Sequence, residues 1–139
     1  MATALLGLVA GGALWALTQA NNYASISRLY TGAETAAQNQ IDYLMMDSPF
    51  NPQSSQFGTT SEWAVGTSAL QTVTIYSEPA GADGQSHSIT GQMVTTVTSN
   101  SVVYKSQNLN LYSATVVVTY TFRSKTYRVQ LNTMRASDV

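Results

Sequence analysis

The first charged side chain of this chain is Arg28, so the chain begins with 27 residues that carry no charged side chain. Within them, the run Leu5–Leu17 (LLGLVAGGALWAL) contains only apolar residues and glycine. At about 1.5 Å per residue, a helix over residues 1–20 would be about 30 Å long, the thickness of a hydrocarbon core. The large apolar side chains of this run are Leu5, Leu6, Leu8, Val9, Leu14, Trp15 and Leu17. The pattern predicts that residues 1–22 form a transmembrane or assembly helix.

Two other interpretations of this segment are open. A secretory signal peptide would place small residues near a cleavage site, as Thr18 and Ala20 do, but no basic residue precedes the apolar run. A buried core helix of a soluble protein usually contains polar residues over such a length. We therefore favour a helix that the mature protein keeps.

Residues 23–48 show the period of an amphipathic helix. Apolar residues recur at spacings of three and four: Tyr23, Ile26, Leu29, Tyr30, Ala33, Ala37, Ile41, Leu44 and Met45. No proline occurs before Pro49, so one helix can continue from near Met1 to about Met46, and Pro49 and Pro52 would end it. Such a helix of about 45 residues is about 70 Å long. Its first half must then project from the rest of the protein.

Residues 49–139 are predicted to form an antiparallel sheet domain. Residues 72–76 alternate as a strand, and residues 87–98 and 102–106 are two weaker candidates. In the clearest strand, alternate residues from Ala114 to Phe122 share one apolar face, and residues 123–126 form a polar turn before a strand over 127–132. The predicted fold class is α+β, with this hairpin packed on the apolar stripe of the helix.

Composition argues against several classes of function. Six basic and seven acidic residues give a net charge of −1, whereas nucleic-acid binding needs a basic surface. There is no cysteine, and His87 is the single histidine. His87, Glu78 and Asp83 flank a glycine-containing turn that lacks the alternating ligands of a calcium loop. We expect no enzymatic activity, no cofactor and no metal.

The apolar N-terminal helix, its amphipathic continuation and the C-terminal sheet resemble the type IV pilins and pseudopilins. ATALLGLVAGGAL (2–14) is similar to the transmembrane part of that family's N-terminal segment. AQNQID (37–42) and the closing hairpin with Tyr127 and Arg135 are similar to minor-pilin-like members. The family's processing site and early glutamate have no counterpart here, since the first acidic residue is Glu34. The family's neutralisation of a neighbour's N-terminal amine is therefore not assigned to this chain.

The resemblance implies a structural subunit that polymerises through its N-terminal helix into an extracellular type IV pilus-like filament. Its partners would be copies of itself and, before assembly, the bacterial inner membrane. The chain has no nucleotide-binding motif, so we expect an external assembly ATPase and platform proteins to extract it. The alternatives are a minor pilin or pseudopilin of a secretion or pilus-priming complex, and a membrane-anchored monomeric binding domain.

Glycines and charges add two hypotheses about the polymer. Gly7, Gly11 and Gly12 weaken a helix, so a stretched segment is expected within residues 7–18 of the polymer; alternatively they only allow close helix packing. Between Leu29 and Tyr104 all six charged residues are acidic, whereas five of the six that follow are basic. Basic residues that could pair with a neighbouring subunit are Arg123, Lys125, Arg128 and Arg135. Pairing within one subunit, or simple solvation, is the alternative.

Overall fold

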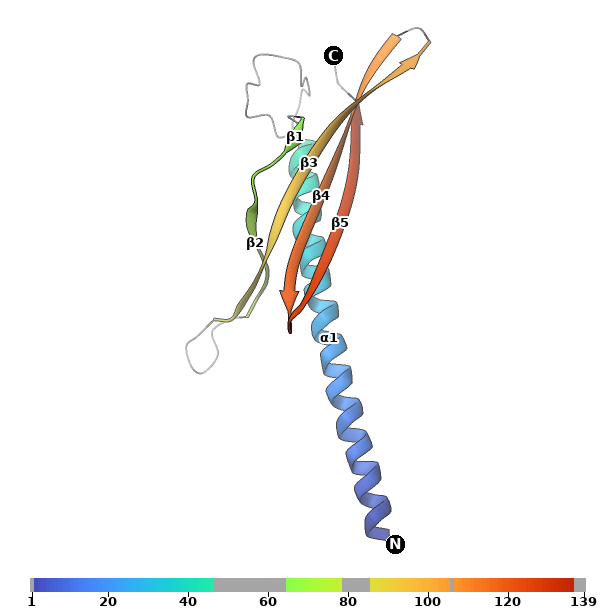
Figure 1. The fold of residues 1–139 in the computed structure, drawn as a ribbon, viewed down its shortest axis with the longest axis vertical. Coiled ribbons are helices and arrows are strands. Elements are labelled where there is room, and N and C mark those ends of the chain that lie inside the picture. Colours follow the sequence, from blue (N-terminus) through green and yellow to red (C-terminus); the bar gives the residue numbers. More distant parts are fainter. Residues whose placement is uncertain (1, 47–64, 79–85, 106, 137–139) are drawn as a thin grey trace.

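The computed structural model describes residues 2–46, 65–78, 86–105 and 107–136; the side chains of residues 2–6, 104, 107 and 108 lie outside the described part. The first element is one helix, α1 (Ala2–Met46), which contains no proline and runs without a break as the sequence predicted. Figure 1 shows its N-terminal half projecting well beyond the sheet. The proline-containing segment predicted to end the helix lies outside the described residues.

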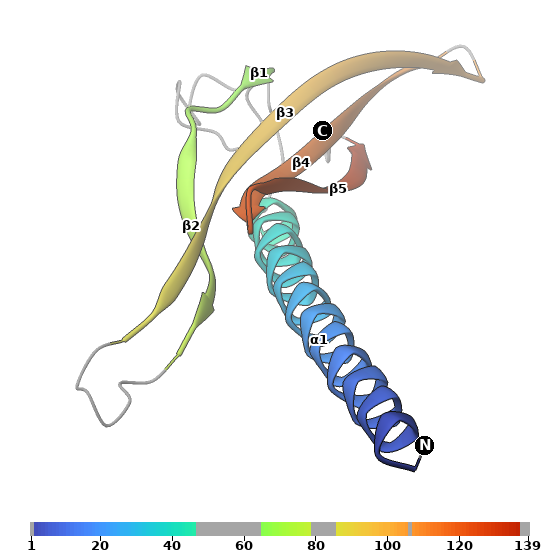
Figure 2. The same ribbon diagram turned by 60° about the horizontal axis from the view of Figure 1, so that its bottom comes forward.

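The strands form a single antiparallel sheet, in which the order of the strands differs from their order in the chain. They are β1 (Gly66–Thr67), β2 (Gln71–Ser77), β3 (Ser88–Tyr104), β4 (Gln107–Phe122) and β5 (Lys125–Ala136). Their order is β1-β3-β4-β5, and β2 pairs with the same strand β3 as β1 does. Figure 2 shows that the sheet is strongly curved and that α1 lies against one of its faces. The predicted α+β class is confirmed.

Two details of the predicted strands are wrong. The candidates at 87–98 and 102–106 are one continuous strand, β3. Its polar middle stays extended because β4 pairs with it residue by residue, from Gln92 opposite Thr119 to Tyr104 opposite Gln107. The predicted four-residue turn at 123–126 has only two residues, which adopt positive φ angles of 49° and 61° as in a type I′ hairpin turn.

The core lies between the sheet and the C-terminal half of α1. Buried helix residues meet buried residues of β2, β3, β4 and β5: Leu29, Ala33, Ala37, Ile41 and Leu44 from the helix, with Ile75, Met93, Val97, Tyr112, Ala114, Val116, Val118, Tyr120 and Val129 from the sheet. The predicted stripe was wrong at Tyr23, Tyr30 and Met45, which are exposed. Tyr30 and Met45 each follow a buried leucine, and one residue turns the helix by about 100° away from the sheet.

A close approach fixes the position of α1 against β2. A Cβ atom added to Gly32 would lie 2.2 Å from the carbonyl oxygen of Ile75. Only glycine therefore fits at this point of the helix. At the other end of the packed half, the Arg135 guanidinium donates a hydrogen bond to the Met45 carbonyl oxygen at 3.3 Å. The sheet thus satisfies one of the carbonyl groups that a helix C-terminus leaves unpaired.

Candidate functional site

The projecting part of α1 over residues 7–22, which we call the stem, is the candidate functional site because large apolar side chains are exposed along it. Five large apolar side chains of the stem are between 67% and 77% exposed: Leu8, Val9, Leu14, Trp15 and Leu17. At 100° per residue, these five point in directions spread around the whole circumference of the helix. An ordinary surface helix has one polar face, whereas the first eleven residues of the stem, 7–17, contain no polar side chain.

The exposure of the stem is energetically costly in water. Burying a large apolar side chain contributes about 1.5–3 kcal/mol, so the five together correspond to about 8–15 kcal/mol. That sum is comparable with the whole net stability of a domain, about 5–15 kcal/mol. The remaining two residues predicted for this surface, Leu5 and Leu6, have side chains outside the described part.

Over the described residues, no helix combines the length and the hydropathy that crossing a membrane requires. The predicted span over residues 1–22 includes residues 1–6, whose side chains are not described. The membrane span therefore stays a prediction.

The three glycines of the stem are uncovered. An added Cβ at Gly7, Gly11 or Gly12 would meet no atom of the described residues within 4 Å, so the helix surface is open at these positions. In this single chain α1 is helical throughout residues 7–18. The stretched segment was predicted for the polymer, so that hypothesis and its alternative of close packing are both untested.

Where the stem meets the sheet, a hollow of about 250 Å³ lies between α1 and the β4–β5 turn. Arg123, in the turn, donates a hydrogen bond to the Asn22 side-chain oxygen on the helix. Lys125 and the aromatic rings of Tyr23, Phe122 and Tyr127 also line this hollow. The contact ties the turn to the helix at the point where the stem begins.

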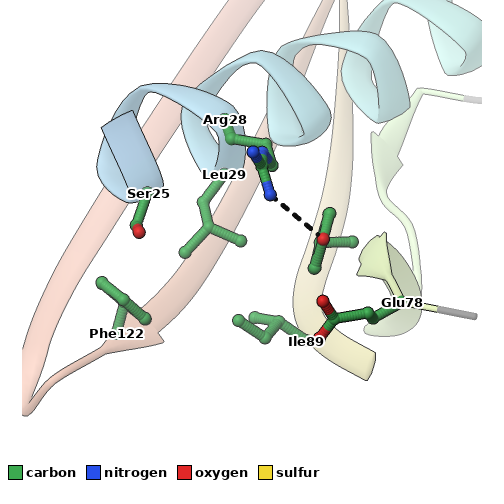
Figure 3. A pocket seen from close by; sticks show the side chains of 7 residues that line it. Ser25, Arg28, Leu29, Glu78, Ile89 and Phe122 are labelled. Atoms are coloured by element: carbon green, nitrogen blue, oxygen red, sulfur yellow. Dashed lines mark hydrogen bonds between the residues drawn. The ribbon is translucent and has the colours of Figure 1, made fainter. Parts of the chain in front are cut away.

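A second hollow, also of about 250 Å³, lies beside the first and shares Phe122 with it. Figure 3 shows Arg28 pointing from α1 toward β2, where it donates a hydrogen bond of 3.2 Å to the Tyr76 hydroxyl oxygen. The same guanidinium lies 5.5 Å from the centre of the Tyr76 ring, within the range of a cation–π contact. Glu78 contributes a carboxylate to this hollow. The sequence marked Arg28 only as the end of the uncharged segment, and nothing in the sequence predicted its partner.

The four basic residues proposed to pair between subunits divide into two groups. Arg123 and Arg135 form hydrogen bonds within their own chain, to Asn22 and to the Met45 carbonyl. Lys125 and Arg128 are exposed along β5. Pairing with a neighbouring subunit stays a prediction for all four.

His87 and Glu78 lie on either side of the turn considered as a calcium or catalytic site, and the turn itself, residues 79–85, lies outside the described residues. His87 is exposed, and its carbonyl accepts the backbone N–H of Glu78 at 2.8 Å. Asp83 lies outside the described residues. Within the described ranges no three His, Asp or Glu side chains lie close enough together to hold a metal ion.

The described core contains a buried side-chain polar atom without a hydrogen-bond partner. The Tyr120 hydroxyl has no hydrogen-bond partner among the described residues, although its ring stacks on Tyr127 at 5.3 Å between ring centres. Burial raises the pKa of Tyr120 above its ordinary value, and the neighbouring Tyr127 and Tyr30 add to the shift. The alternation of β4 predicted that this side chain is buried but gave no sign that its hydroxyl is unsatisfied.

Comparison of the chain with models of known families, with characterised proteins and with solved structures gave no match. The arrangement itself, a long N-terminal helix packed by its second half on a C-terminal antiparallel sheet, is pilin-like.

Proposed function

We propose that this protein is a structural subunit that polymerises through its stem into an extracellular type IV pilus-like filament. The observation that supports this most is the stem, with large apolar side chains exposed on every side next to a well-packed sheet domain. A helix of this kind is stable only where an apolar environment surrounds it on all sides. The centre of a bundle of identical helices is such an environment.

The glycines of the stem explain why the stem would pack against the stems of other copies in preference to lipid. Lipid tails are as apolar as leucine, so moving a stem from a membrane to a bundle gains little from the hydrophobic effect. The bundle must gain from close packing. Gly7 and Gly11 lie four residues apart on one face of the helix, and no atom in the described part of the chain covers them. Small residues at this spacing allow two helix backbones to approach closely.

Before assembly, in this proposal, the stem is held in the bacterial inner membrane and the sheet domain lies on its outer side. The chain itself has no nucleotide-binding motif. Extraction into the filament therefore depends on an external ATPase and on platform proteins. The low content of charged residues, 9% against about 25% in ordinary domains, reduces repulsion between neighbouring subunits.

Electron microscopy after removal of detergent from the purified full chain tests this function. Removing the detergent leaves no membrane from which the stem must be extracted, so we expect the unmodified chain to form fibres without an ATPase. Leu14→Asp should form none, because it places a carboxylate in the core of the bundle. Asn39→Asp is the matched control, since it adds the same group at an exposed position of the packed half of α1. A monodisperse monomer that is stable without detergent would contradict the proposal and favour a monomeric binding domain instead.

A further inference from the structure

Three cations and several aromatic rings gather where the stem enters the sheet domain. Arg28 lies in one hollow and Arg123 and Lys125 in the other, with Tyr23, Phe122 and Tyr127 beside them. We call these six residues the collar. Figure 1 shows that the β4–β5 turn lies at the end of the sheet nearest the projecting half of α1.

The height of the collar on the helix matches the thickness of a bilayer. The segment from residue 2 to residue 21 contains 20 residues, which as a helix are about 30 Å long, the thickness of the hydrocarbon core. The next residue, Asn22, accepts the hydrogen bond from Arg123. If residues 2–21 fill the hydrocarbon core, the guanidinium of Arg123 lies at the level of the lipid phosphates.

The charge at this level is positive. Among the described residues, Glu78 is the acidic side chain that lines the second hollow and none lines the first, so the three cations of the collar exceed the described carboxylates by two. On the helix, the nearest acidic residue beyond Arg28 is Glu34, six residues and about 9 Å farther from the stem. Tyr23 is 70% exposed, and tyrosine rings favour the interface between lipid tails and headgroups.

From this geometry we propose that the collar binds the phosphates of anionic lipid headgroups and so fixes the depth of the subunit in the membrane before assembly. This inference rests on the proposed function, because it requires the stem to be in a bilayer. Arg123 in the turn and Lys125 after it act as the phosphate donors, since guanidinium and ammonium groups donate several hydrogen bonds to phosphate oxygens. The rings of Tyr23, Phe122 and Tyr127 line the same hollow as these two cations, and aromatic side chains at the interface between tails and headgroups stabilise the depth of a protein in the membrane.

Spin-labelled lipids measure the proposed preference directly. The full chain is reconstituted into phosphatidylcholine vesicles that contain trace spin-labelled phosphatidylglycerol or spin-labelled phosphatidylcholine. The fraction of each label immobilised at the protein gives its relative affinity. One lysine or arginine near anionic lipid headgroups strengthens their association with a protein by about fivefold. We therefore expect the protein to prefer the labelled phosphatidylglycerol over the labelled phosphatidylcholine several-fold. Arg123→Gln/Lys125→Gln should abolish most of this preference.

The control is Lys105→Gln/Arg128→Gln, which removes the same charge from positions outside the collar and should keep the preference. Circular dichroism verifies that each variant is folded, and 0.5 M NaCl should reduce the preference of the unmodified chain without any substitution. If neither lipid is immobilised, the chain is not in the bilayer. The proposal that a membrane holds the stem before assembly is then wrong, and so is the collar proposal. If both lipids are immobilised equally, or the collar variant keeps the preference, the collar proposal alone is wrong. A collar variant that keeps its lipid preference but loses fibre formation would instead assign these cations to contacts between subunits.

Discussion

Replacing Gly32 by alanine tests how closely α1 packs against β2 of the sheet. The added Cβ would lie 2.2 Å from the backbone carbonyl oxygen of Ile75. A comfortable contact needs roughly 1 Å more. The carbonyl belongs to Ile75, which lies at the register shift of β2, between Thr74 and Tyr76, whose own partners in β3 are Thr90 and Ile89. A backbone oxygen cannot turn aside as the end of a flexible side chain can, so α1 and β2 must move apart.

The size of the effect follows from two opposing contributions. An outward shift loosens the packing of Leu29, Ala33 and Ala37 against the sheet, and overpacking of this kind costs up to about 3 kcal/mol. Alanine in place of glycine favours the helix by about 1 kcal/mol. We expect a net loss of about 2 kcal/mol in the free energy of unfolding. For a chain of 139 residues this corresponds to a decrease in Tm of roughly 6–10 °C.

The assay is thermal unfolding of the full chain in a mild detergent, followed by the near-ultraviolet circular dichroism of its tyrosines. Gly12→Ala is the control, because no atom lies within 4 Å of its added Cβ and the helix gains about 1 kcal/mol. Gly91→Ala should be intermediate, since its closest neighbour, at 2.6 Å, is the flexible end of the Ile75 side chain. If Gly32→Ala were as stable as Gly12→Ala, α1 would not approach β2 as closely as described.

Three further results are expected. A fragment of residues 21–139 should stay folded and soluble and form no fibres, because every buried helix residue lies after position 28; loss of its cooperative unfolding would show that the stem supports the fold. Tyr120→Phe should stabilise the protein by about 1–2 kcal/mol, because it removes a buried hydroxyl without a described partner. The pKa of Tyr120 in the folded state is raised above 10.0, so the folded protein keeps this hydroxyl protonated to a higher pH than the unfolded chain does. Ionisation of Tyr120 therefore leaves the free energy of unfolding unchanged below about pH 10 and lowers it as the pH rises from there to the raised pKa. Urea unfolding from pH 8 to 12 should therefore show a weaker alkaline loss of stability in the phenylalanine variant, and an equal loss in both would contradict this. Arg135→Leu should cost about 1 kcal/mol and speed amide exchange in the last turn of α1, since it removes the donor to the Met45 carbonyl; unchanged exchange there would refute the capping role.

Much of this fold could be predicted because its patterns are local and long. The absence of proline before position 49 fixed one continuous helix, and the alternation from Ala114 to Tyr120 placed the buried face of β4 correctly. The polar middle of β3 could not be predicted as a strand, because its pairing with β4 and not its own propensity keeps it extended.

The stem was found from the sequence because it depends on the absence of charge, which is directly visible. The collar was not found, because the contacts that position its arginines join residues that are distant in the chain. Arg28 and Tyr76 are 48 residues apart, and Asn22 and Arg123 are 101 residues apart. Such pairs meet only when the helix and the sheet have packed. Gly32 was also overlooked, since one glycine in a helix gives no sign of which backbone approaches it.

Helical reconstruction of the assembled polymer by cryo-electron microscopy would show directly what surrounds each stem. We predict that residues 7–22 of successive copies line the filament axis, with Leu8, Leu14 and Trp15 buried between them and the sheets outside. The same map would show whether residues 7–18 stay helical or become stretched in the polymer. A polymer with the sheets at its axis and the stems in solvent, or a stable monomer with its stem in water, would refute assembly through the stem.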